Sequence, residues 1–311
     1  MIKRGIYIVA NKRSEAECAN LVYSIRASGC QLPIRLIHFG GQPVQAPELL
    51  QQVHLMREED FPPESQEFVA ELATVLTDCP RGFLYRFLGW FGDWDEFIYT
   101  DNDVVALMNW ERLFDHLPGN DLVHADEEYT TQGRFNYAQP DKIQERFGEE
   151  ALLSTVTAGH FVARRHPQLV EDMRKAIEWF QKNPDIPKKH DQALLHVASL
   201  IGGWKMTNLC QPPHHWLSSW AGDYQNPLAL VQAIQSEPAR KISHLHFSGG
   251  KPIGTEPVAD FLSAYLDARQ RIVHLTKLGF LQLGGWVAFC HHSRRIKNGL
   301  CRRWKKFYHE S

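Results

Sequence analysis

The first forty residues of the chain follow a strand–helix–strand pattern, and this pattern limits the possible fold more than any other feature. Residues 6–10 are an apolar run of strand length, residues 15–27 have a helical pattern, and residues 33–39 form a second apolar run. Such a unit predicts a parallel sheet that binds its ligands above the carboxyl ends of its strands. We therefore expect an α/β fold with a mixed, mostly parallel sheet flanked by helices.

A later strand-like run ends in two carboxylates with alternate spacing. Residues 97–100 are β-prone, Asp101, Asn102 and Asp103 follow directly, and an apolar run resumes at Val104. Because alternate residues of an extended segment project to the same side, the side chains of Asp101 and Asp103 can converge on one point. Oxygen ligands at the end of a buried strand suit a hard divalent cation, so the segment predicts a Mg²⁺ or Mn²⁺ site.

Asp93 and Asp95 repeat the same spacing before this strand. They follow Gly92, where a turn is expected, and turns favour aspartate. We therefore interpret this pair as a solvated turn.

Apolar periodicity also predicts helices over residues 83–91 and 167–182.

A histidine-containing strand lies late in the chain. His244 and His246 alternate within residues 242–247, and Gly249, Gly250 and Lys251 follow. The glycines let the backbone approach an anion, and the lysine offers a point charge suited to phosphate. An imidazole beside two carboxylates would complete a Mn²⁺ site. A buried structural histidine followed by a surface lysine is the alternative.

Two shorter motifs carry less information by themselves. Residues 157–159 are small and precede a strand, where a ligand could lie against the backbone. Asp191 and Gln192 stand at a helix start, where Asp191 could simply cap the helix.

The four motifs lie, in chain order, at residues 101–103, 157–159, 191–192 and 246–252. In that order they resemble the motifs of nucleotide-sugar glycosyltransferases with the A-type fold. They are most similar to the retaining family 8 enzymes, which include glycogenin and bacterial lipopolysaccharide galactosyl- and glucosyltransferases. The resemblance spans roughly residues 5–255. This chain departs from the family pattern at three points: Thr157 replaces an asparagine, the spacing from His246 to Lys251 is one residue shorter, and Ile253 stands where tryptophan is usual.

The resemblance implies a role for each motif residue. Asp103 and His246 would bind the metal ion directly, and Asp101 would bridge the metal ion and the ribose. Asp191 and Gln192 would face the transferred sugar at the reacting carbon. The other implied donor-binding residues are Ala10 and Asn11 at the uracil base, Arg86 and Asn102 at the donor, and Gly249 and Lys251 at the diphosphate.

The resemblance also implies a single Rossmann-like catalytic domain over residues 1–255. This domain would use Mn²⁺ or Mg²⁺ to move a hexose from a nucleotide-diphosphate sugar, a UDP-hexose, to a glycan or lipid-linked acceptor, with retention. Inversion would need an acidic base, for which Asp126, Glu127 and Glu128 are candidates. A sugar-1-phosphate nucleotidyltransferase is disfavoured because residues 11–14 lack its glycines, and a non-catalytic nucleotide-sugar-binding protein remains an alternative.

The charge of the chain is unevenly distributed. Residues 291–311 contain seven Lys or Arg and one acidic residue, interleaved with aromatic residues. Such a composition suits peripheral contact with an anionic membrane, and a solvated terminal helix is the alternative. We predict a helical, basic-aromatic extension over residues 256–311 and no nucleic-acid binding, because the basic residues are confined to this end. The scattered cysteines and the short apolar run near the N-terminus predict a cytoplasmic protein. The basic C-terminal residues could place it peripherally at the inner face of the membrane.

Overall fold

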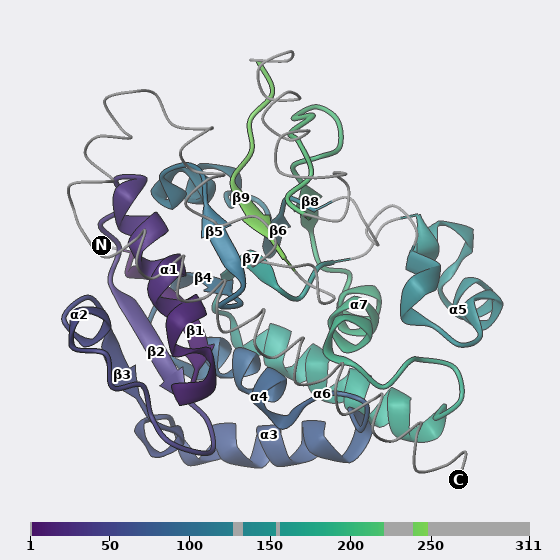
Figure 1. Cartoon of the computed structure of the whole chain (residues 1–311). Coiled ribbons are helices and arrows are strands. Elements are labelled where there is room, and N and C mark those ends of the chain that lie inside the picture. The colour runs from purple at the N-terminus through teal and green to yellow at the C-terminus, as the bar shows by residue number, and fades with distance from the viewer. Residues whose placement is uncertain (1, 127–132, 154–155, 221–238, 248–311) are drawn as a thin grey trace, which may run out of the picture.

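The computed structural model describes residues 2–126, 133–153, 156–220 and 239–247. Its centre is a mixed sheet, in which the described strands follow the order β3-β2-β1-β4-β7-β6-β8 (Figure 1). These strands are β1 (Arg4–Ala10), β2 (Ile34–His38), β3 (His54–Met56), β4 (Glu96–Thr100), β6 (Leu122–His124), β7 (His160–Arg164) and β8 (Met206–Asn208). A separate ribbon pairs β5 (Val104–Ala106) with β9 (His244–His246) in antiparallel register. The predicted extension over residues 256–311 lies outside the described residues.

The strand directions confirm the predicted mixed, mostly parallel sheet. Strand β1 lies between β2 and β4 and runs parallel to both, and β3 runs parallel to β2. Strand β7 is antiparallel to β4 and β6, whereas β8 is parallel to β6. The carboxyl ends of β1, β2 and β4 therefore meet at one edge of the sheet, where ligands of open α/β folds bind.

Helices cover both faces of the sheet. The described α-helices are α1 (Glu15–Ala27), α2 (Pro47–Leu50), α3 (Pro63–Val75), α4 (Arg81–Leu84), α5 (Pro140–Phe147), α6 (Pro167–Lys182) and α7 (Asp191–Gly202). Short 3₁₀ helices are η1 (Lys12–Ser14), η2 (Glu58–Asp60), η3 (Tyr85–Phe91), η4 (Trp110–His116), η5 (Gly133–Asn136) and η6 (Glu149–Leu152). Figure 1 shows α1 on one side of the sheet and α3, α4 and α6 on the other.

Alternating apolar side chains bind the sheet to both helical layers. In β1, Ile6 and Ile8 belong to the core on the α1 side, whereas Tyr7 and Val9 belong to the core on the opposite side. Because successive strand residues point to opposite faces, a continuous apolar run is what a sheet covered on both faces requires. This is why the N-terminal strand could be predicted from its sequence.

The helix predicted over residues 83–91 differs from what forms there. Helix α4 ends at Leu84, and the chain continues as the 3₁₀ helix η3. This segment is rich in aromatic residues and contains Gly89, all with low helix propensity. Its side chains are buried from Tyr85 to Trp90, so tertiary packing decides its conformation.

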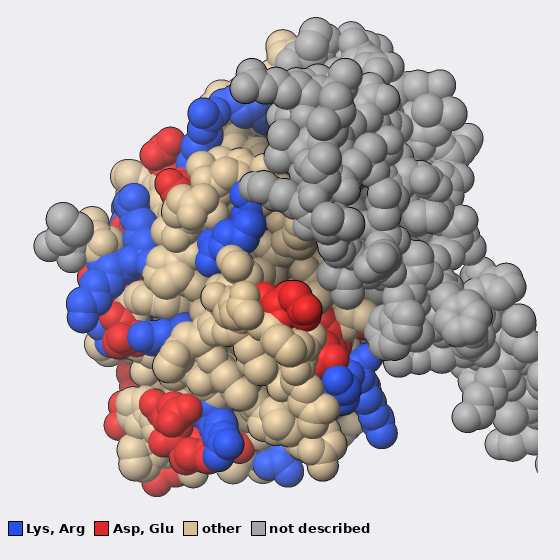
Figure 2. Space-filling view, turned by 60° about the vertical axis from the view of Figure 1, so that its left-hand side comes forward, with Lys and Arg blue, Asp and Glu red and all other residues tan. Residues whose placement is uncertain are grey.

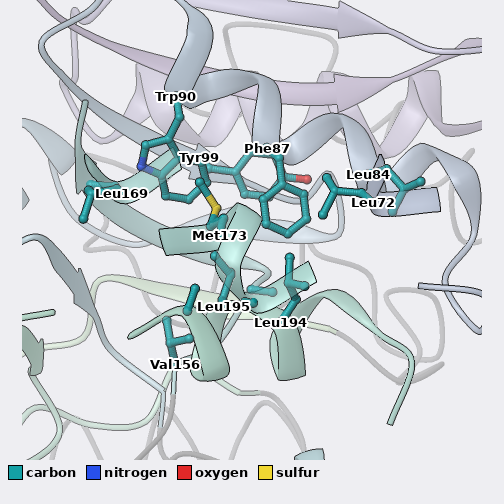
Figure 3. Packing of buried hydrophobic residues seen from close by; sticks show 14 of the residues in the cluster. Leu72, Leu84, Phe87, Trp90, Tyr99, Val156, Leu169, Met173, Leu194 and Leu195 are labelled. Carbon is teal, nitrogen blue, oxygen red and sulfur yellow. The ribbon is translucent and has the colours of Figure 1, made fainter. Parts of the chain in front are cut away.

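A hydrophobic cluster fixes the position of α7. Leu194 and Leu195 of α7, Met173 of α6 and Tyr99 of β4 belong to this cluster, and Figure 3 shows their side chains close to one another. Helices α6 and α7 therefore pack against the sheet as one layer. The first residue of α7, Asp191, is thereby held near the carboxyl edge.

The surface of the described residues carries charges of both signs. On the face shown in Figure 2, acidic and basic side chains are interspersed, and the whole chain has a formal net charge of −2. None of the helices that the structure describes is long and apolar enough to cross a bilayer.

His160, the first residue of β7, belongs to a buried aromatic group. Its ring centroid lies 4.5 Å from that of Trp110 and 3.8 Å from that of His244. Burial, together with the charge of His246, lowers the pKa of His160 to about 3. The imidazole is therefore neutral in the folded chain at neutral pH.

We expect that Leu195→Ala lowers the free energy of unfolding by about 2–5 kcal/mol, because it leaves a cavity in the layer that holds α7. Leu195 is fully buried, whereas Leu153 is 66% exposed. The matched variant Leu153→Ala should change the free energy of unfolding by no more than about 0.5 kcal/mol. Urea unfolding measures both, and equal losses would contradict the packing described above.

A second expectation concerns pH. The unfolded chain protonates His160 below a pH of about 6.5, and the folded chain does so only near the lowered value. The contribution of His160 therefore makes stability fall as the pH drops from 6.5 towards 3. His160→Phe should make this fall shallower by up to about 1.4 kcal/mol per pH unit. Urea unfolding between pH 6.5 and 5 measures the slope, with the exposed His54 replaced by glutamine as the control; an unchanged slope in His160→Phe would contradict the burial argument.

Candidate active site

The Asp-Asn-Asp turn begins where β4 ends, at the carboxyl edge of the sheet. The backbone N–H of Asp101 donates to the carbonyl oxygen of Gly159, with an N–O distance of 2.7 Å. The side-chain amide of Asn102 donates to the carbonyl oxygen of Val9 at 3.2 Å. The turn is thus tied on one side to the residue before β7 and on the other to the end of β1.

The ribbon of β5 and β9 brings His246 back to this turn. Val104 pairs with His246, the N–H of His246 donates to Ser219 at 2.7 Å, and the N–H of Phe247 donates to the carbonyl of Asp103 at 3.0 Å. The Nε2 atom of His246 lies 3.3 Å from Oδ1 of Asp103. A residue more than a hundred positions later in the chain is therefore fixed beside Asp103.

Three side chains converge as the sequence predicts. One ligand atom from each of Asp101, Asp103 and His246 lies within 4.8 Å of the others. Two ligands on opposite sides of an ion with bonds of about 2.0–2.2 Å are about 4.0–4.4 Å apart, so a small contraction would allow all three to bind one cation. Two carboxylates and one imidazole suit Mn²⁺ or Mg²⁺ better than a thiolate-preferring metal. The residues fit the cation, and its binding stays a prediction.

The three groups polarise one another. Burial acts to raise the pKa of Asp103, but the charge and hydrogen bond of His246 outweigh it, so the pKa is lowered. Burial acts to lower the pKa of His246, but Asp103 and Asp101 raise it to about 9. The imidazole of the metal-free chain is therefore protonated at neutral pH. A cation bound through its nitrogen would displace that proton, as is general for histidine ligands.

Arg86 joins this turn to the start of α7. Its Nη2 atom lies 3.1 Å from Oδ1 of Asp101, and its Nη1 atom lies 2.5 Å from Oδ2 of Asp191. The arginine side chain is only 2% exposed, and its Nε donates to the carbonyl of Phe83 at 3.1 Å. The hydroxyl of Tyr99 donates to Oδ1 of Asp101 at 2.6 Å. We call Arg86, Asp101, Asp191 and Tyr99 the arginine network.

Burial sets the charge states of the arginine network. It acts to lower the pKa of Arg86, but the charges of Asp101 and Asp191 raise the pKa above its ordinary value. The pKa of Asp101 is raised, because burial and the charge of Asp103 outweigh the opposing charge of Arg86. Burial also raises the pKa of Tyr99, which stays a hydrogen-bond donor. The guanidinium is therefore a permanent cation between two carboxylates.

Asp191 does not cap α7. The cap is His190, whose Nδ1 accepts from the N–H of Ala193 at 3.4 Å, which leaves the carboxylate of Asp191 free to pair with Arg86. Gln192 is half-buried, and its amide donates to Oδ1 of Asn136 at 3.4 Å. The thiol of Cys79 lies beside Asp191, and burial together with this carboxylate raises its pKa to about 12.

The residues expected at the uracil base stand at the end of β1. Ala10 is buried. The side-chain amide of Asn11 donates to the carbonyls of Phe39 and Gly40, both at 3.2 Å, and its Oδ1 accepts from the N–H of Arg13 at 2.9 Å. Asn11 therefore holds together the loops that follow β1 and β2, and its contact with a base stays a prediction.

Gly249 and Lys251, expected at the diphosphate, lie outside the described residues. The structure thus brings together Asp101, Asp103 and His246 directly, and links Arg86 and Asp191 to them.

The second acidic pair lies at the opposite end of β4. Asp93 pairs with Arg35, and Asp95 pairs with Arg165 at 3.6 Å. The backbone N–H of Asp95 donates to the carbonyl of Lys3 at 2.9 Å. The side chains of Asp93 and Asp95 are 56% and 48% exposed, which agrees with their interpretation as a surface turn.

Sequence reasoning missed Tyr99 as a residue of the site, and it gave Gly159 only as part of a small-residue segment. Tyr99 precedes Asp101 by two positions in an extended segment, and alternation would have placed both side chains on one side. The small residues 157–159 did suggest that something lies against the backbone, but the occupant is the imidazole of His246.

No protein-family model and no curated protein matches the chain. Among solved structures, the apo form of the bifunctional glycosyltransferase WbbM is similar over 88% of this chain, with a TM-score of 0.55 and 13% identity. The chain spans about half of WbbM, since the match covers 51% of that protein.

Two further structures are similar at lower scores. The galactosyltransferase LgtC, solved with donor and acceptor sugar analogues, matches 90% of this chain and 95% of its own, with a TM-score of 0.49 and 15% identity. Mouse xyloside xylosyltransferase 1 in its apo form matches 81% of this chain and 100% of its own, with a TM-score of 0.47 and 13% identity. Together with the strand order of the sheet, the likeness to WbbM shows that the chain has the A-type glycosyltransferase fold.

Proposed function

We propose that the chain is a metal-dependent glycosyltransferase that moves a hexose from a UDP-sugar to a glycan or lipid-linked acceptor. The observation that carries the proposal is the convergence of Asp101, Asp103 and His246 at the carboxyl edge of an A-type sheet. That edge is where open α/β folds bind their ligands. Mn²⁺ or Mg²⁺ would be held by these three side chains.

The chemistry requires stabilisation of negative charge. When the bond from the anomeric carbon to the diphosphate breaks, the sugar becomes oxocarbenium-like and charge grows on the phosphate. A divalent cation would supply most of the compensation in a cleft of low effective dielectric. Lys251 would add a second positive charge. Tyr99 and Arg86 act on this site through Asp101, whose carboxylate they orient.

The arginine network would also position the carboxylate of Asp191 beside the transferred sugar. Arg86 is buried and bonded to both carboxylates, so we propose that it acts on the donor through Asp101 and Asp191. Asp191 and Gln192, at the start of α7, would face the transferred sugar at the reacting carbon. The family resemblance implies that the transfer proceeds with retention. The inverting alternative would use Asp126, which is buried and close enough to His246 to raise the pKa of that imidazole.

Two exposed aromatic rings next to the arginine network support a sugar substrate. Phe83 is 44% exposed and Phe135 is 39% exposed. Arg86 lies over the ring of Phe83 at 5.0 Å, and the ring of Phe135 lies 5.8 Å from that of His190, the residue before Asp191. The apolar C–H face of a pyranose could bury area against either ring.

One further proposal concerns residues outside the described part of the chain. We propose that residues 291–311 contact an anionic membrane peripherally at its inner, cytoplasmic face, where a lipid-linked acceptor would be found. The support is their composition alone, seven basic residues interleaved with aromatic side chains.

The metal assignment predicts that Asp103→Ala abolishes Mn²⁺-dependent binding of UDP without unfolding the chain, because it removes one direct ligand. The control is Asp93→Ala, which removes the carboxylate with the same spacing at the other end of β4 and should leave the affinity unchanged. Titration calorimetry with UDP, with and without Mn²⁺, measures both. An unchanged affinity in Asp103→Ala, or an equal loss in Asp93→Ala, would show that the wrong pair was chosen.

The placement of Asp191 predicts that Asp191→Asn lowers the rate of transfer or hydrolysis of a labelled UDP-hexose by about 10²- to 10³-fold, the scale for removing one charge-stabilising group. The exposed Asp185, a few residues earlier, provides the control Asp185→Asn, which should keep the rate. ¹H NMR of the first-formed product tests retention. A chain that binds UDP-hexoses but neither transfers nor hydrolyses any of them would instead be the non-catalytic binding protein.

A further inference from the structure

Gly159 contacts two of the three candidate metal ligands at once. Its carbonyl oxygen accepts the backbone hydrogen bond of Asp101 at 2.7 Å. The next residue, His160, pairs with Thr100 across β7 and β4. The backbone of Gly159 is therefore fixed by the sheet, and it fixes the backbone of Asp101 in turn.

The other face of Gly159 is covered by the imidazole of His246. A Cβ atom at position 159 would lie 2.2 Å from Cε1, 2.9 Å from Nε2 and 3.0 Å from Nδ1 of that ring. Cβ atoms in proteins essentially never approach other heavy atoms closer than 3.0 Å. The ring thus occupies the space that any other amino acid at position 159 would fill.

His246 cannot yield easily to such a side chain. Its residue is only 5% exposed. Its backbone N–H is bonded to Ser219, and the next N–H, that of Phe247, is bonded to Asp103. With β9 held at both positions, an added methyl group must rotate the ring, and Nε2 then leaves its place 3.3 Å from Oδ1 of Asp103.

We propose that Gly159 is a positioning residue of the metal centre. Its carbonyl sets the backbone of Asp101, and its missing side chain sets the imidazole of His246 against Asp103. This inference rests on the proposed function in one respect, namely that the three side chains bind a divalent cation. It assigns to Gly159 a role in metal affinity, whereas the sequence suggested only that a ligand could lie against this backbone.

The test is the affinity of Gly159→Ala for Mn²⁺ alone, measured by electron paramagnetic resonance of free Mn²⁺ without nucleotide. We expect binding weaker by about 10- to 100-fold, the range for residues that orient metal ligands. The control is Gly5→Ala, whose Cβ would lie 2.3 Å from the ring of Trp94 near the amino end of β1. This equally crowded variant should lose stability but bind Mn²⁺ like the unaltered chain.

A double-mutant cycle identifies the contact responsible. In a His246→Ala background, the methyl group of Gly159→Ala meets no ring, so its cost in thermal stability should largely disappear. An undiminished cost in that background would overturn the proposal, as would Mn²⁺ binding in Gly159→Ala as tight as in the unaltered chain. If the unaltered chain binds no Mn²⁺, the proposed metal dependence fails, and the metal role of Gly159 fails with it.

Discussion

The buried charge of Arg86 is the interaction on which the candidate site depends. Removing a guanidinium from water costs several kcal/mol, and the attraction of Asp101 and Asp191 offsets this only because both carboxylates lie within ion-pair distance. Such a group adds little to stability compared with an apolar core, but it specifies geometry. One planar cation fixes the spacing between the end of β4 and the start of α7, and a lysine could not bridge both carboxylates in this way.

The site is built from segments that are distant in sequence and rigid in structure. The turn after β4 supplies Asp101 and Asp103, β9 returns His246 to them, and α7 supplies Asp191. Helix α7 is anchored in the core by Leu194 and Leu195, and β9 is anchored by its pairing with β5. Chemistry that needs charges held in place before the reaction begins is served by such anchoring.

The comparisons and the site support different parts of the interpretation. The likeness to WbbM shows the fold, and a fold by itself hosts many activities. The function is argued from the site: carboxylates and an imidazole within reach of one cation, an arginine network beside them, and exposed aromatic rings next to that network. The double contact of Gly159 belongs to the same argument, because it explains why a small residue precedes β7.

The sequence alone determined the features that depend on local pattern. Apolar runs with the right period specified β1, α1, β2, β4 and α6, because burial on both faces of a sheet or on one face of a helix leaves that pattern in the residues. The spacing of Asp101 and Asp103 specified an acidic turn at a strand end. Only the tertiary structure decided which distant groups meet these elements. Packing between segments far apart in the chain determines the 3₁₀ geometry of η3, the pairing of Arg86 with Asp191 and the contact of His246 with Gly159. Such long-range contacts cannot be predicted from the local periodicity of the sequence.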